Sequence, residues 1–185
     1  ALPRGFVPAE AVQLTAAVDL GKYVAHWVLV AWQRDATGHI VEYGRLDVPS
    51  SDLGVEQAIL TTLRQFRDLV MAGWPRAGES RKPVVPDQVW IDSGYMAPVV
   101  YEFCRQAGRR FRPAIGRGAA QQRAQWYNRP TKTGSTVQVI GEGYHFNLLP
   151  AERLLLVEVD ADYWKTWVHE RLTIPLGNPG ALTFF

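Results

Sequence analysis

Residues 89–118 read VWIDSGYMAPVVYEFCRQAGRRFRPAIGRG and predict a strand, a helix and a second strand in succession. The run at residues 88–91 is short, apolar and followed by the turn residues Ser93 and Gly94, which is typical of a buried strand. A helix is expected from about residue 98 to 107, and residues 111–115 form the next strand. Two strands joined through a helix run parallel, so this stretch is a βαβ unit.

Three strands are predicted N-terminal to this unit. They are rich in β-branched and aromatic residues, and turn signals at Gly21 and at residues 36–38 separate them, so antiparallel pairing fits best. They span residues 13–20, 24–32 and 40–48. Between them and the βαβ unit, apolar side chains recur at helical spacing over residues 55–71, which predicts an amphipathic helix that covers the sheet.

The C-terminal third continues the pattern. Residues 136–140 and 145–149 predict a hairpin that turns at residues 141–143, and residues 154–159 predict a strand that leads into a helix over residues 162–172. Residues 182–185 are a candidate final strand. Antiparallel strands followed by alternating helices and parallel strands predict an α/β fold with a mixed sheet flanked by helices, in one domain over residues 1–185.

Charge is segregated along the chain, although 20 Lys and Arg nearly balance 18 Asp and Glu overall. No acidic residue lies between Glu102 and Glu142, a segment that also contains Trp126 and Tyr127. The cations of this segment are Arg105, Arg109, Arg110, Arg112, Arg117, Arg123, Arg129 and Lys132. Such an unneutralised field is expected to bind the phosphates of a polyanion without reading base sequence. Lys22 is a further candidate phosphate contact.

Four aspartates lie at the predicted ends of strands, where α/β sheets place their sites. Asp19 ends the first strand, Asp92 ends the strand of the βαβ unit, and Asp160 and Asp162 begin the last helix. Singly, each is more often a turn or helix cap. Together, beside a basic segment, they predict ligation of two Mg²⁺ or Mn²⁺ ions, which prefer carboxylate oxygen. Glu158 is a weaker candidate, on the same strand face as Asp160.

Two other residues favour structural roles. The single cysteine, Cys104, lies in the apolar run of a predicted helix and is expected to be a buried thiol, so no disulfide forms. His145, between Tyr144 and Phe146, is more typical of packing or surface than of metal binding. No apolar run of about 18 residues and no signal-peptide pattern occurs, so membrane insertion is not expected.

The quoted segments resemble a known family. TAAVDLGKYVAHWVLVAW (residues 15–32), VWIDSGYMAPVVYEFCRQAG with FRPAIGRG after it, and LLLVEVDADYWKTWVHERL with NPGALTFF are similar to the nuclease domain of tailed-phage terminase large subunits, the lambda-type branch above all. The resemblance implies a ribonuclease H-like, divalent-metal-dependent endonuclease that cuts concatemeric viral DNA during packaging. It makes Asp19 and Asp92 the first two metal ligands.

The resemblance leaves the third ligand open. Asp160 is our first choice and Asp162 the second, and an acid beyond Phe185 is a third alternative. The implied partners are double-stranded DNA, an ATPase motor domain in the same polypeptide, the small terminase subunit and the portal, in the cytoplasm of a bacterial host. The chain contains no GxxxxGK[ST] motif, and it begins at Ala1, so we expect a fragment that lacks the motor.

Three alternatives remain open at this stage. A junction resolvase or transposase-type nuclease of the same fold would use the same acids on another DNA shape. A catalytically silent DNA-binding module would use the acids only as caps. An actin-like or sugar-kinase ATPase lobe is suggested by VDLGK at residues 18–22, but such enzymes need two lobes to close over nucleotide.

Overall fold

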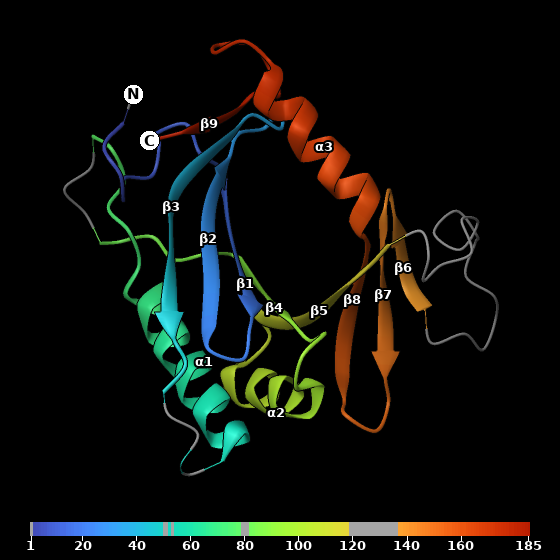
Figure 1. The fold of residues 1–185 in the computed structure, drawn as a ribbon. Coiled ribbons are helices and arrows are strands. Elements are labelled where there is room, and N and C mark those ends of the chain that lie inside the picture. Colours follow the sequence, from blue (N-terminus) through green and yellow to red (C-terminus); the bar gives the residue numbers. More distant parts are fainter. Residues whose placement is uncertain (1, 50–51, 53, 79–81, 119–136) are drawn as a thin grey trace.

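The computed structural model describes residues 2–49, 52, 54–78, 82–118 and 137–185. These residues form one nine-stranded mixed sheet and three helices (Figure 1). The strands are β1 (Gln13–Leu20), β2 (Val24–Trp32), β3 (Gly38–Asp47), β4 (Gln88–Asp92), β5 (Phe111–Arg117), β6 (Val137–Gly141), β7 (Tyr144–Leu149), β8 (Leu154–Asp160) and β9 (Leu182–Phe184). The helices are α1 (Val55–Ala72), α2 (Ala97–Ala107) and α3 (Ala161–Thr173).

The sheet order is β6-β7-β8-β5-β4-β1-β2-β3-β9. Strands β1, β2 and β3 are antiparallel neighbours, as predicted, whereas β1, β4, β5 and β8 run parallel to one another. The predicted hairpin forms β6 and β7, and β7 pairs antiparallel with β8. The candidate final strand is confirmed as β9, which pairs parallel with β3 at the opposite border of the sheet. The predicted α/β fold with a mixed sheet is therefore confirmed.

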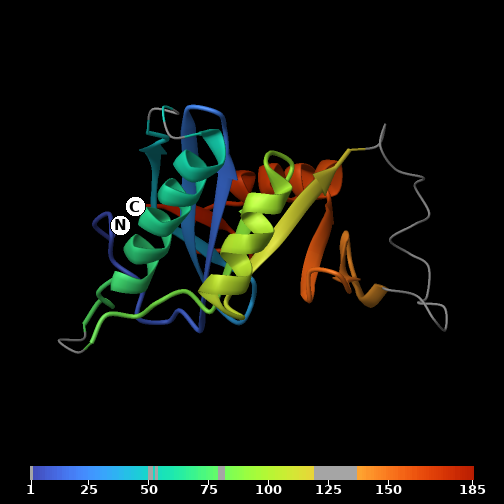
Figure 2. The same ribbon diagram turned by 90° about the horizontal axis from the view of Figure 1, so that it is seen from below.

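Helices cover both faces of the sheet (Figure 2). Helices α1 and α2 pack side by side on one face, where Trp27 of β2 contacts Phe66 of α1. Helix α3 lies across the other face, where Trp167 contacts Trp32 of β2. The two faces can therefore be told apart by residue parity along each strand, because successive side chains point to opposite faces.

Most of the core lies under α1 and α2. Leu14, Ala16 and Val18 of β1 are buried, and so are Val89 and Ile91 of the neighbouring β4. The residues between them, Asp19 among them, point toward the α3 face. Parity thus places the last residue of β4, Asp92, on the same face as Asp19.

The expectation that Cys104 is a buried thiol is also confirmed. Cys104 is buried in α2, and burial raises the pKa of its thiol to about 12, so it remains neutral. In the part of the chain that the structure describes, no helix is long and apolar enough to cross a membrane.

Candidate active site at the carboxyl ends of β1 and β4

Asp19 and Asp92 lie side by side at the carboxyl ends of two parallel strands. The register of β1 and β4 pairs Val18 with Ile91, so Asp19 and Asp92 are the next residues on the two strands and share the α3 face. Asp19 is exposed and Asp92 is half-buried. Two carboxylates from segments more than seventy residues apart in the sequence therefore meet at one edge of the sheet.

The electrostatics of Asp92 reflect this position. Burial raises the pKa of the Asp92 carboxyl, and the charge of Asp19 raises it further. The backbone N–H of Gly94 donates to Asp92 Oδ1 over 3.1 Å and acts in the opposite direction. Two like charges held together without a cation favour protonation, and they gain affinity for any positive group that enters.

His26 and Arg45 extend the acid pair into a row across four strands. In the antiparallel ladders, Asp19 pairs with His26 of β2, and His26 pairs with Arg45 of β3. Directly opposed residues have Cβ atoms about 4.5–5.5 Å apart and lie on one face. We call the row Asp92, Asp19, His26 and Arg45 the acid edge. Sequence reasoning missed its two basic members. The hairpin turn at residues 21–24 fixes the register that identifies His26, whereas Arg45 depends on the β2–β3 register, which shifts between Leu29 and Val30.

Asp160 and Asp162 lie at the junction of β8 and α3. Asp160 is the N-cap of α3, and its Oδ1 accepts the backbone N–H groups of Asp162 and Tyr163 at 3.1 and 3.0 Å. The Asp162 carboxylate lies beside Gly118, where an added Cβ would meet Asp162 Oδ2 at 3.6 Å. The helix-cap role that these residue types often have is thus observed for Asp160.

The register separates this junction from the acid pair. Asp92 is level with Ala114 of β5, whereas Asp160 is level with Arg117, three residues farther along and one strand beyond β5. Strand rise and spacing then place the Cα atoms of Asp92 and Asp160 roughly 14 Å apart. Consistent with this, no group of three or more His, Cys, Asp or Glu side chains among the described residues is placed to hold one metal ion.

Glu158 and His145 form a buried ion network on the other face. Glu158 Oε2 lies 2.8 Å from His145 Nε2, and Oε1 lies 2.8 Å from Arg117 Nη2. Both acidic and imidazole side chains are almost fully buried. Because both carboxylate oxygens have protein partners, Glu158 fits a structural role, and His145 packs in the interior as the sequence favours.

Among the described residues, the cations of the predicted basic segment are divided between the two ends of β5. Arg109, Arg110 and Arg112 lie at the start of β5, at the opposite end of that strand from Arg117. Lys22, in the turn after β1, is exposed near the acid edge, with its Nζ 5.1 Å from the centroid of the Tyr23 ring. The remaining predicted contacts lie outside the described residues: Arg123, Trp126, Tyr127, Arg129 and Lys132.

The donor set of the acid edge fits a hard divalent cation. Asp19 and Asp92 supply carboxylate oxygens, which Mg²⁺ and Mn²⁺ prefer. Burial raises the pKa of Asp92, and the charge of Asp19 adds to this rise. The site can therefore concentrate positive charge beside a phosphate. An exposed Asp19 leaves the edge open to a large ligand.

Three antiparallel strands followed by parallel strands, with acids at the carboxyl ends of β1 and β4, define a ribonuclease H-like nuclease domain. The chain belongs to the family described as "Terminase large subunit gpA, endonuclease domain", whose model matches residues 1–185. The resemblance seen in the sequence is therefore confirmed. Membership gives the chain a nuclease role in phage DNA packaging, and its reaction class is hydrolysis.

Other comparisons add no functional argument. No curated protein matches the chain. Among solved structures, it is similar to an exopolyphosphatase from Cytophaga hutchinsonii, with 13% identity and a TM-score of 0.36 over 56% of this chain. A Ppx/GppA family member from Aquifex aeolicus gives 10% identity and a TM-score of 0.35 over the same share. The chain covers 35% of the length of each, and at these TM-scores neither carries an argument.

Proposed function

We propose that this domain is a divalent-metal-dependent endonuclease that cuts concatemeric viral DNA during genome packaging. The observation that carries the proposal is the adjacency of Asp19 and Asp92 at the carboxyl ends of β1 and β4, on one face of the sheet. Asp92 also accepts the backbone N–H of Gly94, so it caps its local turn as well. Burial and then the neighbouring charge of Asp19 raise the pKa of its carboxyl, which favours a bound cation.

Asp19 and Asp92 would hold the first cation. Two bound Mg²⁺ or Mn²⁺ ions would supply activation of a water molecule on one side of the phosphodiester and stabilisation of the leaving oxygen on the other. The protein's own part is to fix the carboxylates at the ends of two rigid strands. No covalent bond between protein and DNA is required.

For the third ligand, the helix cap distinguishes the two candidates. We propose that Asp162 binds a cation and that Asp160 positions it by capping α3. Gly116 lies on the α3 face of β5, and a Cβ added there would meet the Cβ of Ala161 at 3.5 Å. This contact places the first residues of α3, Asp162 among them, on the α3 face. Asp160 instead shares the strand parity of Glu158, which faces α2, and its Oδ1 already accepts two backbone N–H groups.

His26 and Arg45 are proposed to act on the substrate beside the acid pair. Arg45 is exposed, always charged and suited to a bidentate phosphate contact. His26 is exposed next to Asp19, within reach of a group that gains or loses a proton there. Lys22 would extend the same phosphate-binding surface. Further proposed DNA contacts are Arg123, Arg129, Lys132 and Arg117, which pairs with Glu158 on the other face of the sheet.

The wider setting follows the family. We propose that an ATPase motor domain in the same polypeptide, the small terminase subunit and the portal work with this domain in the cytoplasm of a bacterial host. The junction resolvase and transposase alternatives share the acid edge but would not act on packaging intermediates.

The proposal is tested by nicking and linearisation of supercoiled plasmid in EDTA, Mg²⁺ and Mn²⁺. We expect cutting only with a metal ion, and its loss in Asp19→Asn and in Asp92→Asn while DNA binding persists. Asp68→Asn, which removes an exposed carboxylate on α1, is the matched control and should cut like the wild type. Cutting that survives in EDTA or in Asp19→Asn would contradict the assignment, and binding without cutting under all conditions would favour a silent module.

A further inference from the structure

A second candidate site lies at the amino end of β5. A cavity of about 620 Å³ opens between the C-terminal end of α2 and the first residues of β5 and β8. It is lined by Cys104, Arg105, Gly108, Arg109, Phe111, Arg112, Pro113, Arg153, Leu154 and Leu155. We call it the arginine pocket. Asp92 is level with Ala114, three residues along β5 from Phe111 of the pocket, which corresponds to about 10 Å along the strand.

The arginine pocket carries positive charge that the described part of the chain does not balance. Of its four arginines, Arg105 forms an ion pair with Glu152. Among the described residues, no ion pair involves Arg109, Arg112 or Arg153. The Arg112 guanidinium lies 5.0 Å from the centroid of the Phe146 ring, and its Nε is buried without a hydrogen-bond partner. These three guanidinium groups are therefore available to bind an anion.

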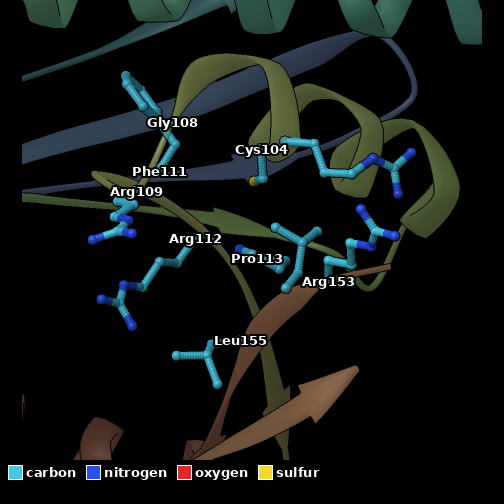
Figure 3. Close-up of a pocket in the computed structure, with 10 residues that line it drawn as sticks. Cys104, Gly108, Arg109, Phe111, Arg112, Pro113, Arg153 and Leu155 are labelled. Carbon is cyan, nitrogen blue, oxygen red and sulfur yellow. The ribbon is translucent and has the colours of Figure 1, made fainter. Parts of the chain in front are cut away.

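The centre of the pocket is apolar. Figure 3 shows Arg109 and Arg112 on one side and Arg153 on the other, with Cys104 and Pro113 between them. Phe111 and Cys104 are buried, and the neutral thiol of Cys104 does not offset the charge of the arginines. A ligand that fills this pocket thus needs an anionic part for the guanidinium groups and an apolar, preferably flat part for the centre.

We propose that the arginine pocket binds a nucleotide, with the phosphate at Arg109 and Arg112 and the base against the apolar centre, which Arg153 borders on the other side (Figure 3). Guanidinium forks match phosphate oxygens in bidentate geometry. The volume lies in the range of small-molecule sites, roughly 300–1,000 Å³. The ligand is either a free nucleotide or one nucleotide of a DNA strand, which offer the same chemistry.

The two strands that line the pocket separate from each other there. The β5–β8 ladder begins at Ala114 and Val157, so residues 111–113 of β5 pair with β4 alone and residues 154–156 of β8 pair with β7 alone. The opening between the strands leaves room for the flat part of a ligand at the apolar centre, and the test below distinguishes a nucleotide from an acidic peptide. Binding here does not depend on metal ions or on cleavage at the acid edge.

The test measures binding of thymidine 5′-monophosphate and of oligothymidylate to the 185-residue chain in EDTA, with Asp19→Asn present throughout so that cleavage plays no part. The pocket variant is Arg109→Gln with Arg153→Gln, two exposed residues whose stems are retained. The control is Arg34→Gln with Arg67→Gln, which removes the same charge far from the pocket. Thermal melts establish that both variants are folded.

We expect the pocket variant to weaken binding about tenfold or more and the control to leave it unchanged. A loss confined to oligothymidylate also supports the proposal and identifies a strand as the source of the nucleotide. The proposal is overturned if neither ligand binds, or if both variants bind as tightly as the parent chain. It is also overturned if a glutamate-rich peptide binds in place of both nucleotides, which would assign the pocket to an acidic partner.

Discussion

The two ends of β5 show how one basic segment serves two different environments. At the carboxyl end, Arg117 lies against the nearly buried Glu158, and the strands beside it end in the acids of the candidate active site. At the amino end, Arg109 and Arg112 line a pocket whose described surroundings contain one acid, Glu152, already paired with Arg105. Cations that are close together in the sequence therefore need not form one surface, because a strand places the residues at its two ends on opposite sides of the molecule.

The largest expected effect is a difference in stability loss between variants that break the ion pair at each end of β5. Glu158→Ala leaves Arg117 and His145 without their buried partner, so we expect a loss of about 3–5 kcal/mol in the free energy of unfolding. Glu152→Ala breaks the exposed pair with Arg105 and should cost about 0–1 kcal/mol. Urea unfolding of both variants measures the contrast. Equal losses would show that the two ends are energetically alike.

The third-ligand proposal predicts a smaller effect, on activity. Asp162→Asn should lower the rate of metal-dependent cutting by about a hundredfold, since a metal ligand is lost. Asp160→Asn should cut nearly normally, because asparagine caps a helix as well as aspartate does. Initial rates of plasmid nicking at saturating Mn²⁺ compare the two. A stronger loss in Asp160→Asn than in Asp162→Asn would restore Asp160 as the ligand.

The cations of the acid edge should affect DNA binding modestly. Lys22→Gln with Arg45→Gln removes two proposed phosphate contacts, so the slope of log K against log salt should become shallower by about 0.9 for each. Binding should weaken alike for every DNA sequence. Fluorescence anisotropy over a salt series in EDTA provides the measurement, with Arg34→Gln and Arg67→Gln as the control. An unchanged slope would remove these residues from the DNA-binding surface.

The smallest expected effect is on stability and follows from the raised pKa of Asp92. A carboxyl whose pKa is raised by folding binds its proton more tightly in the folded state, so stability falls as pH rises through that pKa. At neutral pH, Asp92→Asn removes a half-buried charge beside Asp19 and should raise the melting temperature slightly. The difference should vanish at a pH below the ordinary pKa of aspartate. A lower melting temperature at neutral pH would contradict this account.

The sequence predicted the elements of this fold well because their signals are local. The β-branched and aromatic content of β1 to β3, the turn signals between them and the helical spacing of residues 55–71 are such signals, and the structure confirms these elements. The acids Asp19 and Asp92 were predicted to lie at strand ends from the same signals.

Other features depended on information that no local pattern contains. The partnership of Glu158, His145 and Arg117 arises from three strands whose order in the sheet is set by tertiary packing. The division of the arginines between two edges follows from the length and direction of β5. His26 is a different case, since a local signal for it was present. Its pairing with Asp19 follows from the hairpin register, which the turn at residues 21–24 already indicates.

Binding of Mn²⁺ in the absence of DNA tests the central claim most directly, because it reports on the carboxylate ligands without a contribution from DNA. Titration followed by electron paramagnetic resonance should show Mn²⁺ bound to the wild type and to Asp68→Asn, and little binding to Asp19→Asn or Asp92→Asn. It should also show unchanged binding to Arg109→Gln with Arg153→Gln. Wild-type affinity in a chain that carries both Asp19→Asn and Asp92→Asn would contradict the account.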